Sequence, residues 1–256
     1  LEKELRRKGI KVYCDATVTE ILEEEGSLSC IITPNDGSGP VKTRAGQILM
    51  AIGRRPDVSR LLGKDISLDM KDGKIAVDSD FETSEPGVYA IGDVAARTQL
   101  AHVAAAQGTY VVEKIAGRPH SIKLEVVPNG MFVSLPIVPN CIYTDPEIAT
   151  VGITEEIAKK YGLKVRCGHF SMRDNGKSII TGEEHGFIRL LFEAYSNTIV
   201  GAQMMCPRAT DMIGEIATAI ANGLTAQEMS FAMRAQPTYN EGIGAAIEDA
   251  MRQNPV

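Results

Sequence analysis

The stretch "TSEPGVYAIGDVAARTQLAH", from Thr83 to His102, places an apolar strand pattern directly before a helix start. The apolar run after Gly87 predicts a short strand that ends at Gly92 and Asp93. A helix is predicted over residues 99–116, with a glycine as its stop. In open α/β sheets, ligands bind where strands end and helices begin. The stretch therefore predicts an α/β arrangement with a binding site at Gly92 and Asp93.

The groups at this junction suit a polar ring ligand. A strand that ends in Gly-Asp presents the Asp93 carboxylate without a neighbouring side chain in the way, and the carboxylate can accept hydrogen bonds from a polyol or ribose. The backbone N–H groups of Leu100, Ala101 and His102 have no partner within the helix, and with the helix dipole they would stabilise negative charge on a ring carbonyl. On spacing alone, an alternative stays open, in which Asp93 only caps a turn and the helix only packs in a core.

The residues before this stretch predict part of a mixed fold. The chain begins as the end of a helix that Gly9 stops. Strands rich in β-branched residues are then predicted over residues 10–22, 28–34 and 47–53. One helix followed by several strands makes part of an α/β or α+β unit, and not a complete one.

From Pro139 onward the pattern changes to antiparallel strands with helices. Strands over residues 165–172, 186–194 and 198–205 predict a meander, and Thr225 with Glu228 forms a capping box. Helices are predicted over residues 211–223 and after Asn240. The first of these helices carries an apolar stripe of Met212, Ile213, Ile216, Ala217 and Ile220. This part is an α+β layer, separated from the preceding part at a boundary between Gly117 and Pro139.

Composition excludes several function classes. The chain has 256 residues, a net charge of −6 and no basic run, so neither nucleic acid nor an anionic membrane is an expected partner. Its apolar stretches are too short to span a membrane. No two of the five cysteines lie within fifteen positions of each other, which excludes CxxC redox and zinc motifs. We therefore expect no metal site, and we expect reduced, mostly buried thiols in a cytoplasmic protein.

Five short motifs together resemble one enzyme family. They are "AIGRRPD" (51–57), "GVYAIGDV" (87–94), "LAHVAAAQG" (100–108), "IYTDPEIATVG" (142–152) and "QPTYNEG" (236–242). In this order, the motifs resemble the C-terminal half of a pyridine nucleotide-disulfide oxidoreductase, most similar to the dihydrolipoyl dehydrogenase type. Each motif alone is weak, but the set extends over nearly the whole chain.

The resemblance implies roles for particular residues. Asp93, after Gly92, would bind the ribityl chain of FAD. The stretch Gln99, Leu100, Ala101 and His102 would approach the flavin ring with backbone groups. Gly53 would lie at the NAD(P) site, and Val18 where that domain packs on adenosine.

The sequence also departs from the family pattern. It contains neither a GxGxxG followed by a helix nor the paired cysteines CxxxxC, both of which lie upstream in the family. The resemblance therefore implies four parts. Residues 1–56 would end an NAD(P)-binding domain, 57–118 would close an FAD-binding domain, 119–138 would connect, and 139–256 would form a dimerisation domain. The implied fold class is α/β and α+β, with partial Rossmann-like segments before an α+β dimerisation domain. The chain alone is expected to bind FAD weakly or not at all, and to be inactive.

Position 236 is the most informative departure. In the family a His precedes the Pro of "QPTYNEG" and exchanges a proton with the substrate thiol, and the Glu five positions later orients it. Here Gln236 stands before Pro237, and Glu241 is kept. An amide does not titrate near neutral pH, so Gln236 cannot take that proton. Four explanations stay open: an acceptor that is not a dithiol, a deliberate change, a degenerate or regulatory copy, and a residue that merely ends a loop.

The resemblance implies a homodimeric flavoprotein reductase. It would be FAD-dependent and NAD(P)H-linked, would pass electrons to a small-molecule disulfide or another acceptor, and would serve redox homeostasis. The alternatives are a non-catalytic dimerisation module and a reductase with a non-disulfide acceptor. We also expect the apolar stripe over residues 212–220 to supply an apolar face for the dimer. The alternatives are that it packs only in the core of its own domain, or that it does both.

Overall fold

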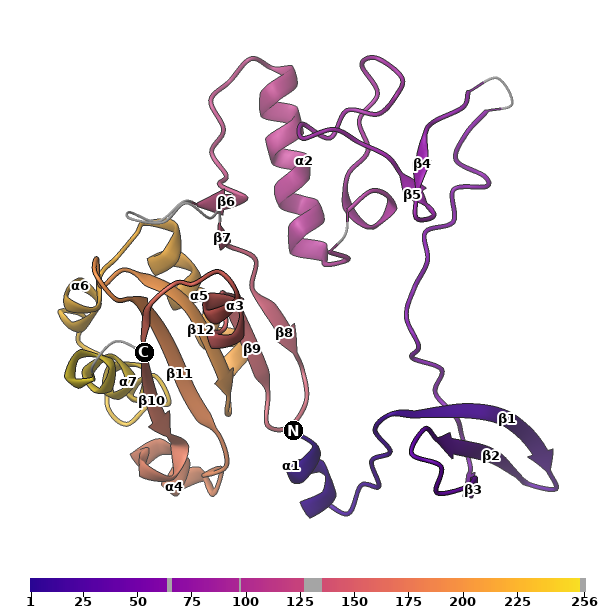
Figure 1. The fold of residues 1–256 in the computed structure, drawn as a ribbon, viewed down its shortest axis with the longest axis horizontal. Coiled ribbons are helices and arrows are strands. Elements are labelled where there is room, and N and C mark those ends of the chain that lie inside the picture. The colour runs from indigo at the N-terminus through magenta and orange to yellow at the C-terminus, as the bar shows by residue number, and fades with distance from the viewer. Residues whose placement is uncertain (64–65, 97, 127–134, 254–256) are drawn as a thin grey trace. The chain divides into compact units, whose positions relative to one another are not determined.

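The computed structural model describes residues 1–63, 66–96, 98–126 and 135–253, and it divides the chain into two compact units. The first unit is Leu1–Arg55 and the second is Pro56–Val256. Figure 1 shows the elements of both units in chain order. The expected connection over residues 119–138 includes residues 127–134, which lie outside the described part.

The first unit is a short helix followed by an antiparallel sheet. Helix α1 (Glu2–Arg7) ends just before Gly9, whose φ of 81° lies in the left-handed region that a glycine adopts freely, so the predicted stop is confirmed. Strands β1 (Ala16–Glu24), β2 (Ser27–Pro34) and β3 (Val41–Ala45) pair in the order β1-β2-β3. The first predicted strand began six residues too early, because residues 10–15 form no ladder.

The strand predicted over residues 47–53 is wrong. These residues form no regular element, and the side chains of Leu49 and Ile52 are 90% and 88% exposed. Consecutive apolar residues are typical of a strand that is buried on both faces of a sheet. Such a strand needs neighbours for its backbone groups, and no described strand pairs with this segment.

The second unit begins with a small two-stranded hairpin and one long helix. Strands β4 (Met70–Lys71) and β5 (Lys74–Ile75) make a small hairpin, and a single bridge joins Glu82 to Tyr89. The strand predicted to end at Gly92 is therefore reduced to that bridge, and η1 (Gly92–Val94) is a 3-10 turn. Helix α2 (Ala101–Ile115) follows and ends before Gly117, as predicted.

The C-terminal part of this unit is built on a five-stranded antiparallel sheet. The strand order is β10-β11-β12-β9-β8. The bounds of the strands are β8 Asn140–Ile142, β9 Ile148–Gly152, β10 Val165–Ser171, β11 Phe187–Glu193 and β12 Ile199–Met205. The predicted meander of β10, β11 and β12 is confirmed. A separate pair, β6 (Glu125–Val126) with β7 (Leu135–Pro136), precedes the sheet.

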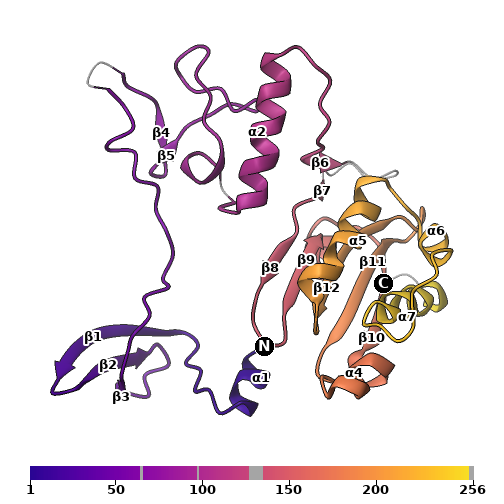
Figure 2. The same cartoon turned by 180° about the vertical axis from the view of Figure 1, so that it is seen from behind.

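Helices cover both faces of this sheet (Figures 1 and 2). The bounds are α3 Glu155–Lys160, η2 Met172–Asp174, α4 Gly176–Thr181, α5 Ala209–Ala221, α6 Ala226–Ser230 and α7 Glu241–Arg252. Ile188 and Leu190 of β11 pack in one core with α5 and α7, while Leu191 packs in a second core with Ala158 of α3. Side chains along a strand alternate between faces, so α3 covers the face opposite α5 and α7. The Thr225–Glu228 capping box of α6 is present as predicted.

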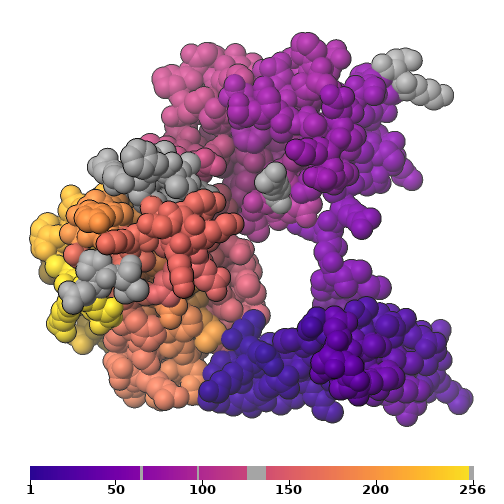
Figure 3. All heavy atoms as spheres, viewed as in Figure 1, coloured from indigo at the N-terminus to yellow at the C-terminus, as the bar shows by residue number. Residues whose placement is uncertain are grey.

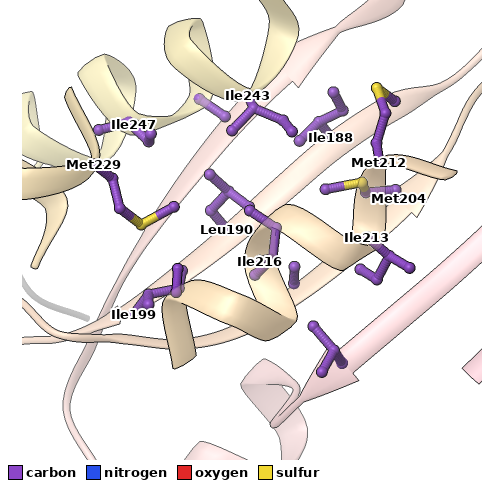
Figure 4. Packing of buried hydrophobic residues seen from close by; sticks show 14 of the residues in the cluster. Ile188, Leu190, Ile199, Met204, Met212, Ile213, Ile216, Met229, Ile243 and Ile247 are labelled. Carbon is purple, nitrogen blue, oxygen red and sulfur yellow. The ribbon is translucent and has the colours of Figure 1, made fainter. Parts of the chain in front are cut away.

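The larger core accounts for the apolar stripe on α5. Met212, Ile213, Ile216 and Ile220 are at most 5% exposed and lie against the sheet, as Figure 4 shows for the first three of them. Because this stripe is buried inside its own domain, it is not available as a dimer surface. Figure 3 shows the heavy atoms of the chain in the orientation of Figure 1.

Candidate functional site

A close approach between η1 and α2 shapes the predicted flavin segment. Gly92 has a φ of 68°, is buried, and donates its N–H to the Gln107 side-chain oxygen at 2.8 Å. A Cβ at position 92 would lie only 2.9 Å from the Cβ of Ala104. Both the backbone conformation and the contact with α2 therefore require glycine at this position.

The start of α2 is open for contacts from outside the helix. Leu100 occupies the N-cap and makes no side-chain capping bond, while Val103 and Ala104 both donate to its carbonyl at 3.1 Å. Ala101 and His102 are exposed in the first turn, where backbone N–H groups have no partner within the helix. Asp93 is half-buried in η1, and Gln99 is half-buried just before the helix.

The imidazole of His102 faces the connection to the next sheet. Its Nε2 lies 2.9 Å from the carbonyl oxygen of Pro139. The ring therefore helps to join α2 to the start of the sheet-forming region, and the backbone of His102 is the part that lies at the helix start.

The two remaining cofactor candidates belong to the first unit. Val18 is 54% exposed on β1, next to an irregularity in the pairing between Val18 and Glu20. Gly53 has a φ of 116°, is exposed, and lies in the irregular segment after β3. The positive φ gives a conformational reason for glycine at position 53.

Gln236 and Glu241 line the same hollow. It has a volume of about 470 Å³ and lies between the β10–α4 region, the loop after α6 and the start of α7. Gln236 is exposed and joins Pro237 through a cis peptide bond. Glu241 is the first residue of α7, and its Oε2 accepts the N–H of Thr238 at 2.9 Å. Among the described residues, no hydrogen bond joins the side chains of Gln236 and Glu241.

The loop that carries Gln236 is held by residues that the sequence analysis missed. Glu215 of α5 accepts hydrogen bonds from Arg234 at 2.6 Å and from Asn240 at 3.1 Å. Asn175, only 2% exposed, donates to the carbonyl of Thr238 at 3.0 Å. Glu215 lies 19 positions before Arg234 in the sequence, and no local motif links them. No sequence signal pointed to this contact.

Carboxylates dominate the charge of the hollow. Asp174, Glu241 and Glu248 line it together with one cation, Arg234. The guanidinium of Arg234 forms an ion pair with Glu215, so its charge is already compensated.

No cysteine is among the described residues that line this hollow. All five are free: Cys14 is exposed, only Cys206 is buried, and the expectation of mostly buried thiols is therefore wrong. Burial raises the pKa of both Cys167 and Cys206 to about 12. Thiols with such pKa values stay protonated at neutral pH and are poor nucleophiles.

The described part of the chain contains neither a cluster of metal ligands nor a helix that could cross a membrane. No group of three or more His, Cys, Asp or Glu side chains there is arranged to hold a metal ion. No helix in the described ranges combines the length and the apolar character that crossing a membrane requires.

Two family models match the chain in order. The pyridine nucleotide-disulphide oxidoreductase model matches residues 1–108, and the dimerisation-domain model of the same family matches residues 138–247. Dihydrolipoyl dehydrogenase from Rhizobium etli is 32% identical over 97% of this chain and 50% of its own length. The Geobacillus stearothermophilus dihydrolipoyl dehydrogenase is 33% identical over 98% and 51%. The chain thus spans about half the length of the curated relatives that it matches.

Solved structures share the fold. LpdA from Mycobacterium tuberculosis superposes with a TM-score of 0.82 at 24% identity, over 98% of this chain and 51% of that protein. The flavoprotein disulfide reductase RclA from Escherichia coli gives a TM-score of 0.79 at 17% identity, over 96% of this chain and 53% of that protein. The two family matches, which together cover most of the sequence, show that the chain belongs to the pyridine nucleotide-disulphide oxidoreductase family.

Proposed function

We propose that the chain is the C-terminal half of an FAD-dependent, NAD(P)H-linked oxidoreductase that resembles dihydrolipoyl dehydrogenase. The observation that carries the proposal is the succession of the two family matches, at residues 1–108 and 138–247. The open start of α2 beside Asp93 supports it, because a ring ligand needs such donors. In the full-length protein, bound FAD would accept a hydride from nicotinamide and pass electrons to an acceptor.

The proposed domain division follows the order of the motifs. Residues 1–56 end the NAD(P)-binding domain, residues 57–118 close the FAD-binding domain, residues 119–138 connect, and residues 139–256 form the dimerisation domain. The compact unit that ends at Arg55 supports the first boundary, and the family match that begins at residue 138 supports the last.

The proposed cofactor contacts follow from the geometry around η1. The Asp93 carboxylate accepts hydrogen bonds from the ribityl hydroxyls of FAD, and Gly92 allows η1 to approach α2 closely. The backbone from Gln99 to His102 turns its N–H groups and the positive end of α2 towards the flavin ring. Gly53 and Val18 contribute to the NAD(P) site in the first unit.

The proposed acceptor site is the hollow beside Gln236. An amide there donates and accepts hydrogen bonds but transfers no proton, so Gln236 orients an acceptor and does not act as its base. A thiol-disulfide cycle would lose a general-base contribution of about 10²–10⁴-fold. We therefore favour a reductase with an acceptor other than a dithiol.

The proposed working form is a cytoplasmic homodimer with a small-molecule acceptor. The dimerisation-domain match supports the dimer. The chain alone is expected to lack activity and to bind FAD weakly or not at all, because it contains no GxGxxG loop to hold the pyrophosphate.

The test uses the full-length parent protein. We expect it to purify with one FAD for each chain, measured by absorbance, and to oxidise NADH or NADPH with an added acceptor. A panel of lipoamide, small disulfides and quinones then separates dithiol chemistry from other acceptors. A parent without flavin and without nicotinamide oxidation would instead indicate a non-catalytic dimerisation module.

A further inference from the structure

We propose that Glu215 is a positioning residue that fixes where Gln236 projects into the hollow. Its carboxylate joins Arg234 and Asn240, which stand on either side of Gln236 in the loop after α6. The inference rests on the proposed function only in taking Gln236 as part of the acceptor site.

The Glu215 clamp, defined here as Glu215 with Arg234 and Asn240, uses both carboxylate oxygens. Oε1 accepts from Arg234 Nη2 at 2.6 Å, and Oε2 accepts from Asn240 Nδ2 at 3.1 Å. The side chain of Arg234 is only 10% exposed, and that of Glu215 is 34% exposed. A charge-assisted bond in such partial burial has a stronger directional preference than a surface pair in water.

Further hydrogen bonds fix the residues next to Gln236. Thr238 donates its hydroxyl to the carbonyl of Ala235 at 2.6 Å, and Asn175 donates to the carbonyl of Thr238. Gln236 itself is exposed. An exposed side chain on a loop held on both sides suits a residue that meets a ligand.

Apolar packing holds only the far end of this loop, where Tyr239 packs against the core. Phe231 is 71% exposed and Met233 is 100% exposed. The segment before Gln236 therefore depends on its polar contacts for its position, and the Glu215 clamp joins both ends of the loop to α5. Replacing a buried ion pair costs little stability when both partners go together, so a role in positioning can be separated from a role in folding.

A histidine introduced by Gln236→His reports the position of the loop in the 256-residue chain. The charged groups that line the hollow are Asp174 from η2, Arg234 from the loop, and Glu241 and Glu248 from α7. With Arg234 paired to Glu215, the carboxylates should hold the pKa of the new imidazole above its ordinary value of about 6.5. Titration by NMR measures that pKa directly and requires neither flavin nor turnover.

The decisive variant removes the ion pair without changing net charge. In the Gln236→His background, Arg234→Met together with Glu215→Gln removes one cation and one anion near the ring, and their direct effects on the imidazole pKa have opposite signs. Movement of the ring away from the carboxylates should then lower this pKa by about half a pH unit or more. The matched control replaces another ion pair in the same way, Arg189→Met with Glu155→Gln, and should leave the imidazole pKa unchanged. An unchanged pKa in the decisive variant, with the fold intact by circular dichroism, overturns the proposal.

A gentler variant covers the case in which the double replacement does not fold. Asn240→Ala removes one bond of the Glu215 clamp and no charge, and it should lower the imidazole pKa in the same direction by a smaller amount. If it has no effect, the proposal fails. If the titrations behave as expected while the full-length parent lacks flavin and activity, the proposed function fails and the positioning role stands.

Discussion

At the scale of single residues, Glu241 has a task that does not depend on an imidazole. Its carboxylate accepts the N–H of Thr238, two residues after Gln236, at the start of α7. Besides the role in orienting a histidine that the family resemblance implies, the same carboxylate fixes the turn at Pro237. Its other oxygen accepts no hydrogen bond from Gln236 in the described part of the chain.

The first prediction concerns proton transfer at position 236. In the full-length parent, Gln236→His should raise dihydrolipoamide oxidation at least tenfold, a modest share of the 10²–10⁴-fold typical of a general base. Steady-state kinetics before and after the change measure the effect, and Gln236→Asn serves as a control that restores no base. High dihydrolipoamide activity with Gln236 in place, or no gain from the histidine, would contradict the prediction.

The second prediction concerns acid stability at Glu193, which is 6% exposed. Burial alone would raise the pKa of Glu193, but hydrogen bonds from Ser196 and Tyr195 outweigh burial and hold the pKa below the ordinary 4.5. A depressed folded-state pKa contributes stability above about pH 4.5, and this stability is lost as the pH falls through the folded-state value. Glu193→Gln should therefore lower the free energy of unfolding by about 1–3 kcal/mol at pH 7.

The same substitution should flatten the dependence of stability on pH below about 4.5. Urea unfolding at several pH values measures this, with Glu156→Gln on the exposed side of α3 as the control. If the Glu193→Gln variant loses as much stability in acid as the unchanged chain, the hydrogen bonds of Glu193 do not cause the acid sensitivity.

At the scale of elements, two glycines in α7 have different environments. A Cβ at Gly242 would lie 2.9 Å from carbon atoms of both Ile188 and Phe170, whereas a Cβ at Gly244 would meet only Arg234, at 3.5 Å. The first approach is closer than side chains tolerate and the second is an ordinary contact.

The third prediction follows from this difference. Gly242→Ala should destabilise the domain by about 1–3 kcal/mol through overpacking. Gly244→Ala should stabilise it by about 0.5–1 kcal/mol, because alanine favours the helix. Thermal and urea unfolding of the two variants compare the same substitution at two places in one helix. Equal effects would show that helix propensity alone decides both.

Local patterns predicted most elements of the C-terminal domain. The strand patterns at residues 165–172, 186–194 and 198–205 predicted β10, β11 and β12, and the capping box of Thr225 and Glu228 predicted the start of α6. The strand prediction for residues 47–53 was wrong because a strand forms only beside partner strands, and its own sequence does not reveal whether these are present. The Glu215 clamp was missed for a related reason, since it joins α5 to a loop through tertiary packing.

The site could be predicted only in part. The sequence predicted that Gly92 and Asp93 belong to a binding site. The contact with Ala104, which explains why position 92 requires glycine, came from the structure. The shared hollow of Gln236 and Glu241, and the carboxylates around it, depend on how η2 packs beside α7 and could not be inferred from spacing.

At the scale of the whole molecule, the second unit contains its own large core, and the dimerisation-domain match lies within it. Because the stripe of α5 is buried in that core, an interface between two copies must use other residues. Among the described residues from 139 onward, large apolar side chains that remain exposed include Ile179, Ile180, Phe231 and Met233.

The last prediction is that the chain forms a symmetric dimer through residues from about 139 onward. Sedimentation equilibrium at micromolar concentration should give about twice the chain mass of 27.6 kDa.

Ile216→Ala removes fully buried atoms, so it should lower the free energy of unfolding by about 2–5 kcal/mol. It should leave the dissociation constant of the folded chain unchanged, because Ile216 faces the core of its own domain. A monomer at micromolar concentration would contradict the dimer, and weaker association of folded Ile216→Ala would show that the stripe of α5 also influences the interface.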